Sequence, residues 1–428
     1  MCSAAAKRNL SLYSPILWQD DMDTVTTSVR CCIAGGGPAG MMLGLLLARA
    51  GVRVLVLEKH ADFLRDFRGD TLHPSTLEVM HELRVLERFL TLPHQQVSRL
   101  NGWFGDLAIT VADFSTLPTR CRFVAFMPQW DFLNFLAEEG KRYGTFQLRM
   151  SAEVTDLIDE AGRIVGLRAV TAEGPLEVRA DLTVGADGRH SAVRMCAGLS
   201  VEEFGAPMDV LWFRLSRRPS DPADPMGRFD AGRIFIMLNR GEYWQCGFVI
   251  AKGSRDRLEA KGLPAFRESV AALASFAADR VVELQSWDAV KLLTVQVDRL
   301  HRWYRAGLLC IGDAAHAMSP VGGVGINLAI QDAVAAANLL AAPLREGRLK
   351  TEDLRTVQAR REWPTRMTQR VQLLIQNRVI RQVLSETEPL SPPLPFRLLA
   401  WFPFLRRVPA YMIGLGFRPE HVQTQEAS

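Results

Sequence analysis

The residues best suited to chemistry in this chain lie in three glycine-containing segments. The first is Gly35-x-Gly37-x-x-Gly40, between an apolar run at 29–34, which predicts a buried strand, and a run at 41–50, which predicts a helix. In such a unit the glycines allow a tight turn, close approach of a pyrophosphate and close helix packing. Because the helix N-terminus offers free N–H groups to phosphates, the segment predicts dinucleotide binding.

A carboxylate in register with this motif indicates the kind of nucleotide. Glu58 follows a second apolar run, 52–57, and lies 18 residues after Gly40. At the end of the second strand of a βαβ unit, a carboxylate accepts hydrogen bonds from ribose hydroxyls. This favours an unphosphorylated ribose, as in FAD or NAD, over NADP.

The other two segments also follow short apolar runs. Asp313 comes after the run 307–311, and a glycine-rich loop and a helix expected over 327–341 follow it. A carboxylate there can hold a ribityl hydroxyl, and loop N–H groups can face the flavin oxygens that gain negative charge on reduction. Asp187 follows the run 178–185, where Asp187-Gly188 alone would indicate only a turn. Together the segments favour FAD.

In their order and spacing, these segments resemble the single-component FAD-dependent aromatic hydroxylases, the flavoprotein monooxygenases of the para-hydroxybenzoate hydroxylase type. The resemblance covers roughly residues 29–344 and implies FAD, with NADH or NADPH and dioxygen as co-substrates. It implies the following cofactor-binding residues: Gly35, Gly37, Pro38, Ala39, Gly40, Glu58, Lys59, Arg68, Gln129, Val154, Asp187, Asp313, Pro320, Gly323, Val324, Gly325, Ile326 and Asn327. Asp187 also matches a residue thought to serve the pyridine nucleotide, and His316 is expected to be structural or a flavin neighbour.

The implied reaction is hydroxylation or epoxidation of an aromatic or other electron-rich small molecule through a flavin C4a-hydroperoxide. No catalytic side chain is identified. Candidates for the substrate pocket are Trp212, Arg214, Phe235, Met237, Trp244, Cys246 and Phe248, although the alternation does not tell whether the last three face substrate or core. Two alternatives stay open: a peripheral-membrane flavoprotein oxidoreductase acting on a lipid or isoprenoid quinone, and a non-catalytic FAD-binding protein.

The elements that must position these residues predict an α/β fold. We expect a Rossmann-like FAD-binding domain interleaved with an antiparallel-sheet substrate domain, plus a C-terminal helical region, because nucleotide-binding elements occur on both sides of an alternating block. The expected parts are an N-terminal extension (1–28, disordered), FAD-binding parts (29–100, 123–205 and 297–345), a substrate-domain ribbon (101–122), the substrate domain (206–296) and the helical region (346–428).

Composition indicates a globular protein. The 428 residues are 48% hydrophobic and 23% charged with a net charge of +4, which is too mild to indicate nucleic-acid binding. Seven scattered cysteines and no metal-ligand spacing predict reduced thiols, no metal site and a cytoplasmic location. We expect a monomer or homodimer.

Both ends of the chain leave alternatives. The first 28 residues lack an apolar signal region, and they form a disordered tail unless translation starts at Met22. Segment 393–417 is apolar with three arginines and several prolines, so we expect a helical cap on the core, with peripheral membrane contact as the alternative.

Overall fold

A computed structural model describes residues 24–64, 71–105, 107–386, 388 and 392–427. The larger of its two main sheets forms the base of the molecule. Its strand order is β19-β20-β11-β1-β2-β8, with β10 and β9 extending from β11. Strands β20, β11, β1, β2 and β8 run parallel, whereas β19, β10 and β9 are antiparallel to their neighbours. These strands are β1 (Val25–Ala34), β2 (Val54–Leu57), β8 (Phe146–Arg149), β9 (Ala152–Glu160), β10 (Arg163–Thr171), β11 (Gly174–Gly185), β19 (Tyr304–Arg305) and β20 (Leu308–Cys310).

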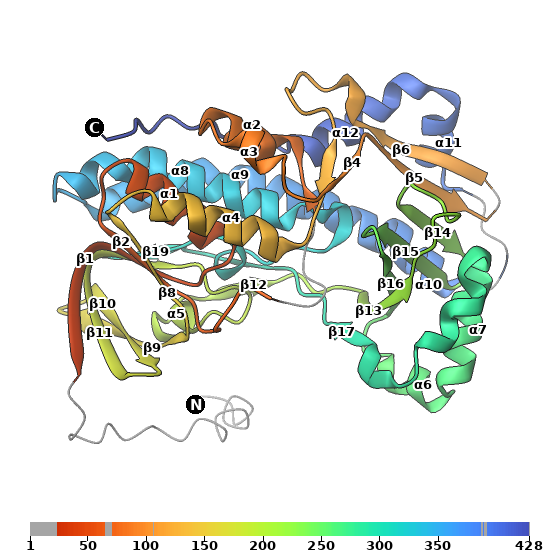
Figure 1. Ribbon diagram of the computed structural model, residues 1–428, viewed down its shortest axis with the longest axis horizontal. Helices are drawn as coiled ribbons and strands as arrows, with labels where there is room; N and C mark the ends of the chain where they lie inside the picture. The colour runs from red at the N-terminus through yellow and green to blue at the C-terminus, as the bar shows by residue number, and fades with distance from the viewer. Residues whose placement is uncertain (1–23, 65–70, 106, 387, 389–391, 428) are drawn as a thin grey trace.

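Four helices lie along one side of this sheet (Figure 1). They are α1 (Pro38–Arg49), α4 (Gln129–Lys141), α8 (Gly325–Arg345) and α9 (Thr351–Ile375). The main core lies between sheet and helices, where Cys32, Leu46 and Ala333 are fully buried. The segment 321–345 is long and apolar enough to cross a membrane, but 72% of its most apolar window is buried, which identifies α8 as a core helix.

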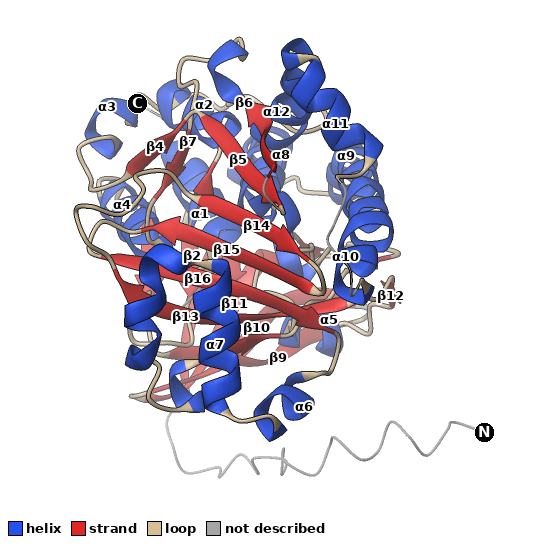
Figure 2. Cartoon of the chain, turned by 90° about the vertical axis from the view of Figure 1, so that its right-hand side faces the viewer, coloured by secondary structure: helices blue, strands red, loops and turns tan. Residues whose placement is uncertain are grey.

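The second sheet has seven strands in the order β17-β13-β16-β15-β14-β5-β6. Helices α6 and α7 cover its outer side, and its other side faces the larger sheet and its helices (Figures 1 and 2). Its elements are β5 (Arg99–Phe104), β6 (Leu107–Asp113), β13 (Met208–Ser216), β14 (Met226–Asp230), β15 (Arg233–Asn239), β16 (Tyr243–Ala251), α6 (Arg255–Ala260), α7 (Leu263–Leu273), the 3₁₀ segments η2 (Ser275–Glu283) and η3 (Trp287–Ala289), and β17 (Lys291–Leu293).

Small elements join the two sheets, and short helices precede an extended C-terminal segment. The connecting elements are β3 (Thr71–Leu72), α2 (Pro74–Glu82), α3 (Leu86–Phe89), β4 (Gln95–Val97), η1 (Phe114–Thr116), β7 (Val124–Phe126), α5 (Ala192–Cys196), β12 (Val201–Glu203), β18 (Asp298–Leu300), η4 (Gly312–Ala314) and η5 (Val321–Gly323). The C-terminal elements are η6 (Gln376–Ile380), α10 (Arg381–Ser385), α11 (Leu394–Trp401), η7 (Pro403–Arg406) and α12 (Arg407–Gly414).

The predicted fold class is confirmed: an α/β dinucleotide-binding unit is interleaved with a second sheet, and a helical region follows. The interleaving is direct, because β5 and β6 join a sheet whose other strands come from 208–293.

Two sequence expectations need correction. The first strand starts at Val25, so residues 25–28 pair with β11 and are not a disordered extension; residues 1–23 lie outside the described part. Between β3 and β4 the chain forms two helices, α2 and α3, with Arg84 between them at a φ of +59°. The second sheet contains one parallel pair, β14 with β5.

Candidate functional site

The turn between β1 and α1 forms a cradle that only glycine allows. Gly35 has a φ of +106°, and a Cβ there would lie 2.4 Å from the Ala186 carbonyl oxygen. A Cβ on Gly40 would lie 2.0 Å from the Gly35 carbonyl oxygen, whereas one on Gly37 would meet nothing within 4 Å. The first turn of α1, which starts with Pro38 and Ala39, has no acidic residue and no side-chain cap. Its N–H groups therefore face open space that suits a phosphate.

Glu58 lies directly beside this cradle. Its side chain is buried, and its Oε2 accepts a hydrogen bond from the Gly36 N–H at 2.9 Å. A Cβ on Gly36 would lie 3.0 Å from the Glu58 Cβ, so this close approach favours glycine at position 36 as well. The Ala152 N–H donates to the Glu58 carbonyl oxygen at 2.9 Å. This bond joins β9, which carries Val154, to the end of β2.

Other predicted cofactor residues surround this edge of the sheet. Lys59 is exposed, and Gln129 is the partly exposed first residue of α4. Arg68 lies outside the described residues. Contact of each with the cofactor stays a prediction.

The glycine-rich loop before α8 presents its backbone on the same side of the sheet. Gly322 and Gly323 have φ values of +79° and +64°, and Val324, directly before α8, provides no side-chain cap. Residues 320–326 are all at least partly exposed, in contrast to the buried turns of α8 that follow. The loop, including Pro320, Gly325 and Ile326, therefore leaves N–H groups at a helix N-terminus for a ligand.

The side chain of Asn327 is fully engaged inside the protein. Its Oδ1 accepts from the His73 N–H at 2.8 Å and the Thr76 hydroxyl at 2.7 Å, and its Nδ2 donates to the carbonyl oxygens of Thr71 at 3.3 Å and Gly323 at 3.5 Å. These bonds tie the loop to the start of α2. Contact of Asn327 with the cofactor stays a prediction, and the engaged side chain leaves its backbone for that contact.

Asp187 and Asp313 flank the loop from two further strand ends. Asp187 accepts from the Ser191 hydroxyl at 2.5 Å and from the Val193 N–H at 3.1 Å, which orders the start of α5. Burial raises the pKa of Asp187 despite these bonds. Asp313 is partly exposed, and its carboxylate lies 3.9 Å from the Arg189 guanidinium.

His316 packs in the core beside Asp332. Its ring is 1% exposed, packs against Trp303 at 4.9 Å between ring centroids, and contacts the Asp332 carboxylate at 2.6 Å through Nε2. The Arg361 Nε donates to the same carboxylate at 3.0 Å. Burial raises the pKa of Asp332, but His316 and the Arg361 charge outweigh this and lower it.

The second sheet corrects most of the predicted substrate pocket. Five candidates lie in the core between the sheet and α7, where each is at most 5% exposed, and do not face the cofactor side: Phe235, Met237, Trp244, Cys246 and Phe248. The register explains this, because Phe213, Cys246 and Met237 are direct cross-strand neighbours and so share one face.

The opposite face of the sheet points toward the glycine-rich loop. Trp212 is partly exposed there and belongs to the same packed cluster as Val321 of that loop. Arg214, with its guanidinium 4.7 Å above the Tyr243 ring, also lies on this face. Sequence reasoning missed the cross-strand neighbours Gln245, Leu238 and Ile236 on this face; only the strand register, which alternation does not reveal, could have found them.

The residues at the ends of the parallel strands fit FAD. The open cradle at Gly37 suits its pyrophosphate, the buried Glu58 suits its ribose, and the loop at the start of α8 suits its flavin. A family model described as "FAD binding domain" matches residues 28–371. The 6-methylpretetramide 4-monooxygenase of Streptomyces rimosus is 32% identical over 381 residues, which are 88% of this chain and 91% of the relative. This chain belongs to the FAD-dependent aromatic hydroxylase family of monooxygenases.

Further members of the family agree in sequence and fold. The rifampicin monooxygenase of Streptomyces venezuelae is 32% identical over 70% of this chain, which spans only 61% of that relative. The solved OxyS anhydrotetracycline hydroxylase from Streptomyces rimosus is 26% identical with a TM-score of 0.70, covering 92% of this chain and 77% of that one. These comparisons give no support to an oxidoreductase of lipids or isoprenoid quinones.

Proposed function

We propose that this monooxygenase uses NADH or NADPH and dioxygen to hydroxylate a fused, multi-ring phenolic substrate, by the C4a-hydroperoxide route that the family resemblance implies. The single observation that supports this choice most is the match to the 6-methylpretetramide 4-monooxygenase over almost the full length of both chains. The sheet face with Trp212, Ile236 and Leu238 suits a flat apolar ring system, and Arg214 lies on that face to contact a polar substituent.

Each part of the site has a distinct task in this proposal. When bound, reduced FAD supplies the chemistry that transfers one oxygen atom from dioxygen. The α1 N-terminus binds the pyrophosphate, and Glu58 binds the adenosine ribose. The loop before α8 offers N–H groups where charge develops on the flavin. The second sheet orients the substrate and excludes water, which limits wasteful release of hydrogen peroxide.

Rapid mixing tests the reaction class. Anaerobically reduced protein is mixed with oxygenated buffer, with and without a phenolic multi-ring compound, while the flavin spectrum and product are followed. We expect a transient oxygenated flavin and a product that contains one added oxygen atom. A flavin that no pyridine nucleotide reduces, with any candidate substrate present, would refute the proposed activity.

A pocket variant tests the substrate face. Trp212→Ala removes an aromatic surface from the face opposite α7, so we expect a higher KM and more hydrogen peroxide per NAD(P)H consumed. Trp363→Ala is the matched control, because Trp363 is 53% exposed on α9. The same yield of hydrogen peroxide per NAD(P)H consumed in both variants would exclude Trp212 from the pocket.

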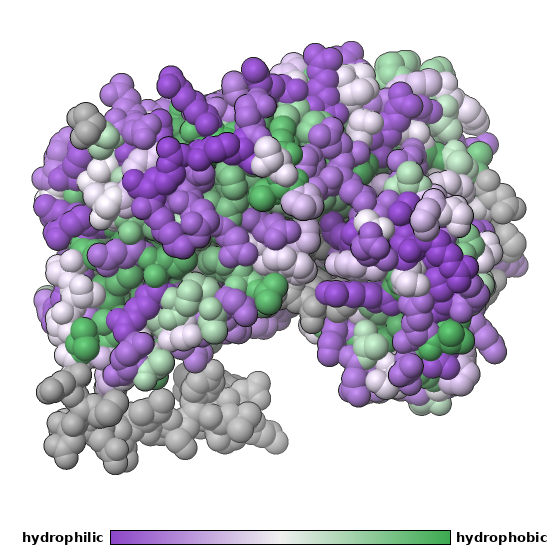
Figure 3. Space-filling model, viewed as in Figure 1, coloured by the Kyte–Doolittle hydropathy of each residue, from purple (hydrophilic) through white to green (hydrophobic). Residues whose placement is uncertain are grey.

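We also propose that the enzyme contacts anionic membranes through the C-terminal apolar surface, defined as the exposed side chains of Leu394, Trp401, Phe402, Phe404, Val408 and Tyr411. Phe404 is 66% exposed, and green residues lie at the upper right of Figure 3, over α11. Segment 393–417 has arginines but no acidic residue, which suits interfacial binding to anionic lipid.

Vesicle flotation tests this contact. The enzyme should float with phosphatidylglycerol vesicles and less with phosphatidylcholine vesicles, and the Trp401→Ser/Phe404→Ser variant should lose the binding that Trp363→Ser retains. No flotation, with a dimer that the double variant dissociates in light scattering, would assign the surface to a second copy instead.

A further inference from the structure

A buried charged network connects the C-terminal segment to the turn that carries Asp313. Its centre is Asp332 on α8, which is 0% exposed. One carboxylate oxygen, Oδ2, accepts from the Gly312 N–H at 3.1 Å and contacts His316 Nε2 at 2.6 Å. The other oxygen, Oδ1, accepts from Arg361 Nε at 3.0 Å.

The network holds Gly312 at a position where the backbone is tightly packed. It directly precedes Asp313, has a φ of +59°, and lies between α1 and α8, where a Cβ would come within 3.1 Å of Ala39 Cβ and 3.2 Å of Ala329 Cβ. Asp332 therefore fixes the orientation of the peptide that presents Asp313. Since Asp332 lies on α8, its hydrogen bond to Gly312 also fixes the position of this peptide relative to the loop at the start of the same helix.

The positive partner of Asp332 is itself held by the C-terminal segment. Arg361 on α9 is 0% exposed, and its NH1 group lies 3.4 Å from Glu420 Oε1. Glu420 is 4% exposed and also accepts two hydrogen bonds from Arg360, at 2.8 and 3.0 Å. The Glu420 N–H donates to Gln331, the residue before Asp332.

We propose that Asp332 is a positioning residue for FAD, and that Glu420 supports it through Arg361. In this arrangement the carboxylate orients the Gly312 peptide, Arg361 balances its buried charge, and Glu420 keeps Arg361 in place. The inference deepens the proposed function, because it rests on FAD binding at Asp313 and at the loop before α8.

Asp332→Asn is the direct test, because it keeps the size of the side chain. The Gly312 N–H, His316 Nε2 and Arg361 Nε groups around the carboxylate can all donate a hydrogen bond. The NH₂ group of an asparagine must therefore face either Gly312 or Arg361, and the hydrogen bond to that residue is lost. We expect the Kd for FAD, measured by flavin fluorescence quenching on folded apoprotein, to rise about tenfold. The visible circular dichroism of bound flavin should change as well.

Two tail variants separate positioning from general stabilisation. Glu420→Gln should raise the Kd for FAD by roughly twofold to fivefold, since it weakens the hold on Arg361 without touching Gly312. Glu426→Gln is the matched control in the same segment: its carboxylate is 56% exposed, pairs with Arg49 at 3.7 Å, and should leave the Kd unchanged.

The outcomes separate this inference from the proposed function. If Asp332→Asn and Glu420→Gln lower only the Tm of the apoprotein and leave the Kd within twofold of wild type, the positioning role is wrong. Should Asp332→Asn not fold, Arg361→Lys gives the same decision, because it keeps the charge but loses the guanidinium geometry. Wild-type apoprotein that binds no FAD would overturn the proposed function together with the inference.

Discussion

Glu58 shows how much one side chain contributes at the scale of single residues. Its carboxylate is buried at the end of β2, where it accepts hydrogen bonds from two backbone N–H groups, Gly36 at 2.9 Å and His60 at 3.1 Å. These bonds aim the carboxylate at the turn where the adenosine ribose is expected. The sequence allowed this prediction because strand, glycines and acid lie within 30 residues of one another.

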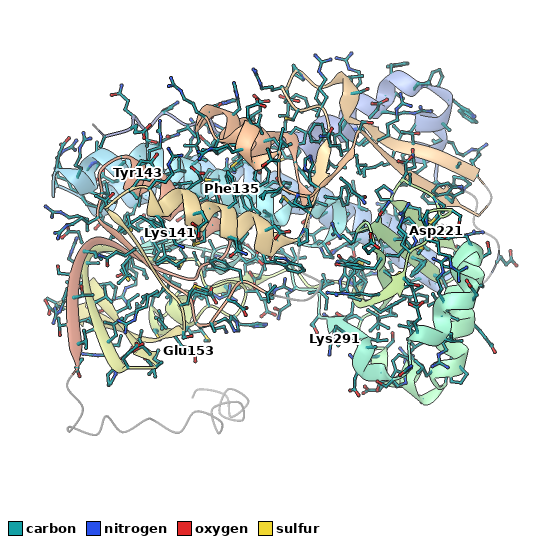
Figure 4. The ribbon with its side chains drawn as sticks, viewed as in Figure 1. Phe135, Lys141, Tyr143, Glu153, Asp221 and Lys291 are labelled. Atoms are coloured by element: carbon teal, nitrogen blue, oxygen red, sulfur yellow. The ribbon has the colours of Figure 1, made fainter. Side chains whose placement is uncertain are left out.

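Replacing Glu58 with alanine should weaken FAD binding. The loss of a two-point charged contact with the ribose corresponds to about 2 kcal/mol, or roughly thirtyfold in Kd. Titration of apoprotein with FAD measures the change. Glu153→Ala, an exposed carboxylate on β9 (Figure 4), is the control and should bind like wild type. An unchanged Kd for Glu58→Ala would show that the adenosine lies elsewhere.

At the scale of elements, His73 connects α2, the loop before α8 and α12. It is 1% exposed, and its Nδ1 hydrogen-bonds the Ile413 carbonyl at 2.7 Å. Burial lowers the pKa of His73 to about 4, although the hydrogen bond opposes this. The imidazole is therefore neutral at pH 7 and must take up a proton when the element opens in mild acid.

Stability should consequently rise with pH between about 4 and 6.5. The unfolded chain binds a proton on this histidine in that range and the folded chain does not, so the contribution is complete above pH 6.5 and lost as the pH falls toward 4. Its full size is about 3 kcal/mol. Urea unfolding of wild type and His73→Asn across this range measures it; His301→Asn, at an exposed position, is the control. Parallel pH curves for wild type and His73→Asn would contradict the prediction.

A buried ion pair fixes the outer side of the second sheet. Arg280 donates two hydrogen bonds to Asp221, at 2.6 and 3.0 Å, and Trp244 donates a third at 2.9 Å. Both charged side chains are at most 4% exposed, and Asp221 lies beside α7 in Figure 4. The Arg280 hydrogen bonds hold the pKa of Asp221 well below its usual range.

Arg280→Met should destabilise the protein by about 3–5 kcal/mol, because it leaves a buried carboxylate without its partner. The stabilisation from Asp221 is present above a pH of about 4 and is lost in stronger acid, since its pKa is lowered in the folded state. Arg218→Met breaks an ion pair to Asp279 whose members are 55% and 54% exposed, so it should cost less than about 1 kcal/mol. Similar decreases in the free energy of unfolding, measured in urea, for Arg280→Met and Arg218→Met would refute the difference expected between the buried and the exposed ion pair.

The packing between elements could not be predicted from the sequence. Alternation correctly indicated a separate sheet that contains β15 and β16, but the side of the sheet on which Trp244 lies depends on its packing against α7, which no local pattern shows. Asp332, Arg361 and Glu420 were not predicted either. They come from separate segments and meet only after folding, and no local motif marks such a cluster.

At the scale of the whole molecule, the two sheets are built from alternating stretches of chain. Strands β5 and β6 precede β13 by about a hundred residues, yet they complete its sheet through the pairing of β5 with β14. The sequence predicted this interleaving, because nucleotide-binding segments lie on both sides of the alternating block. It did not predict the parallel pairing, which depends on tertiary contacts.

An excised fragment of residues 206–296 should not fold cooperatively. It retains β13 to β17 but lacks β5, which leaves β14 as an open edge and uncovers Phe229, whose ring stacks on Phe104 at 4.5 Å between centroids. Far-ultraviolet circular dichroism during urea titration measures this. A sharp unfolding transition of the fragment would mean that the substrate domain is independent of the ribbon.

The position of β1 in the larger sheet has a consequence for protein synthesis. Its neighbour β11 begins at Gly174, and β20, which closes the parallel sheet beside β11, begins only at Leu308. A ribosome that adds 5–20 residues per second needs roughly 15 to 60 s to go from the start of β1 to β20. Throughout that time one edge of the growing parallel sheet lacks its neighbouring strand, so the yield in a cell should depend on chaperone capacity and on elongation rate between these two points.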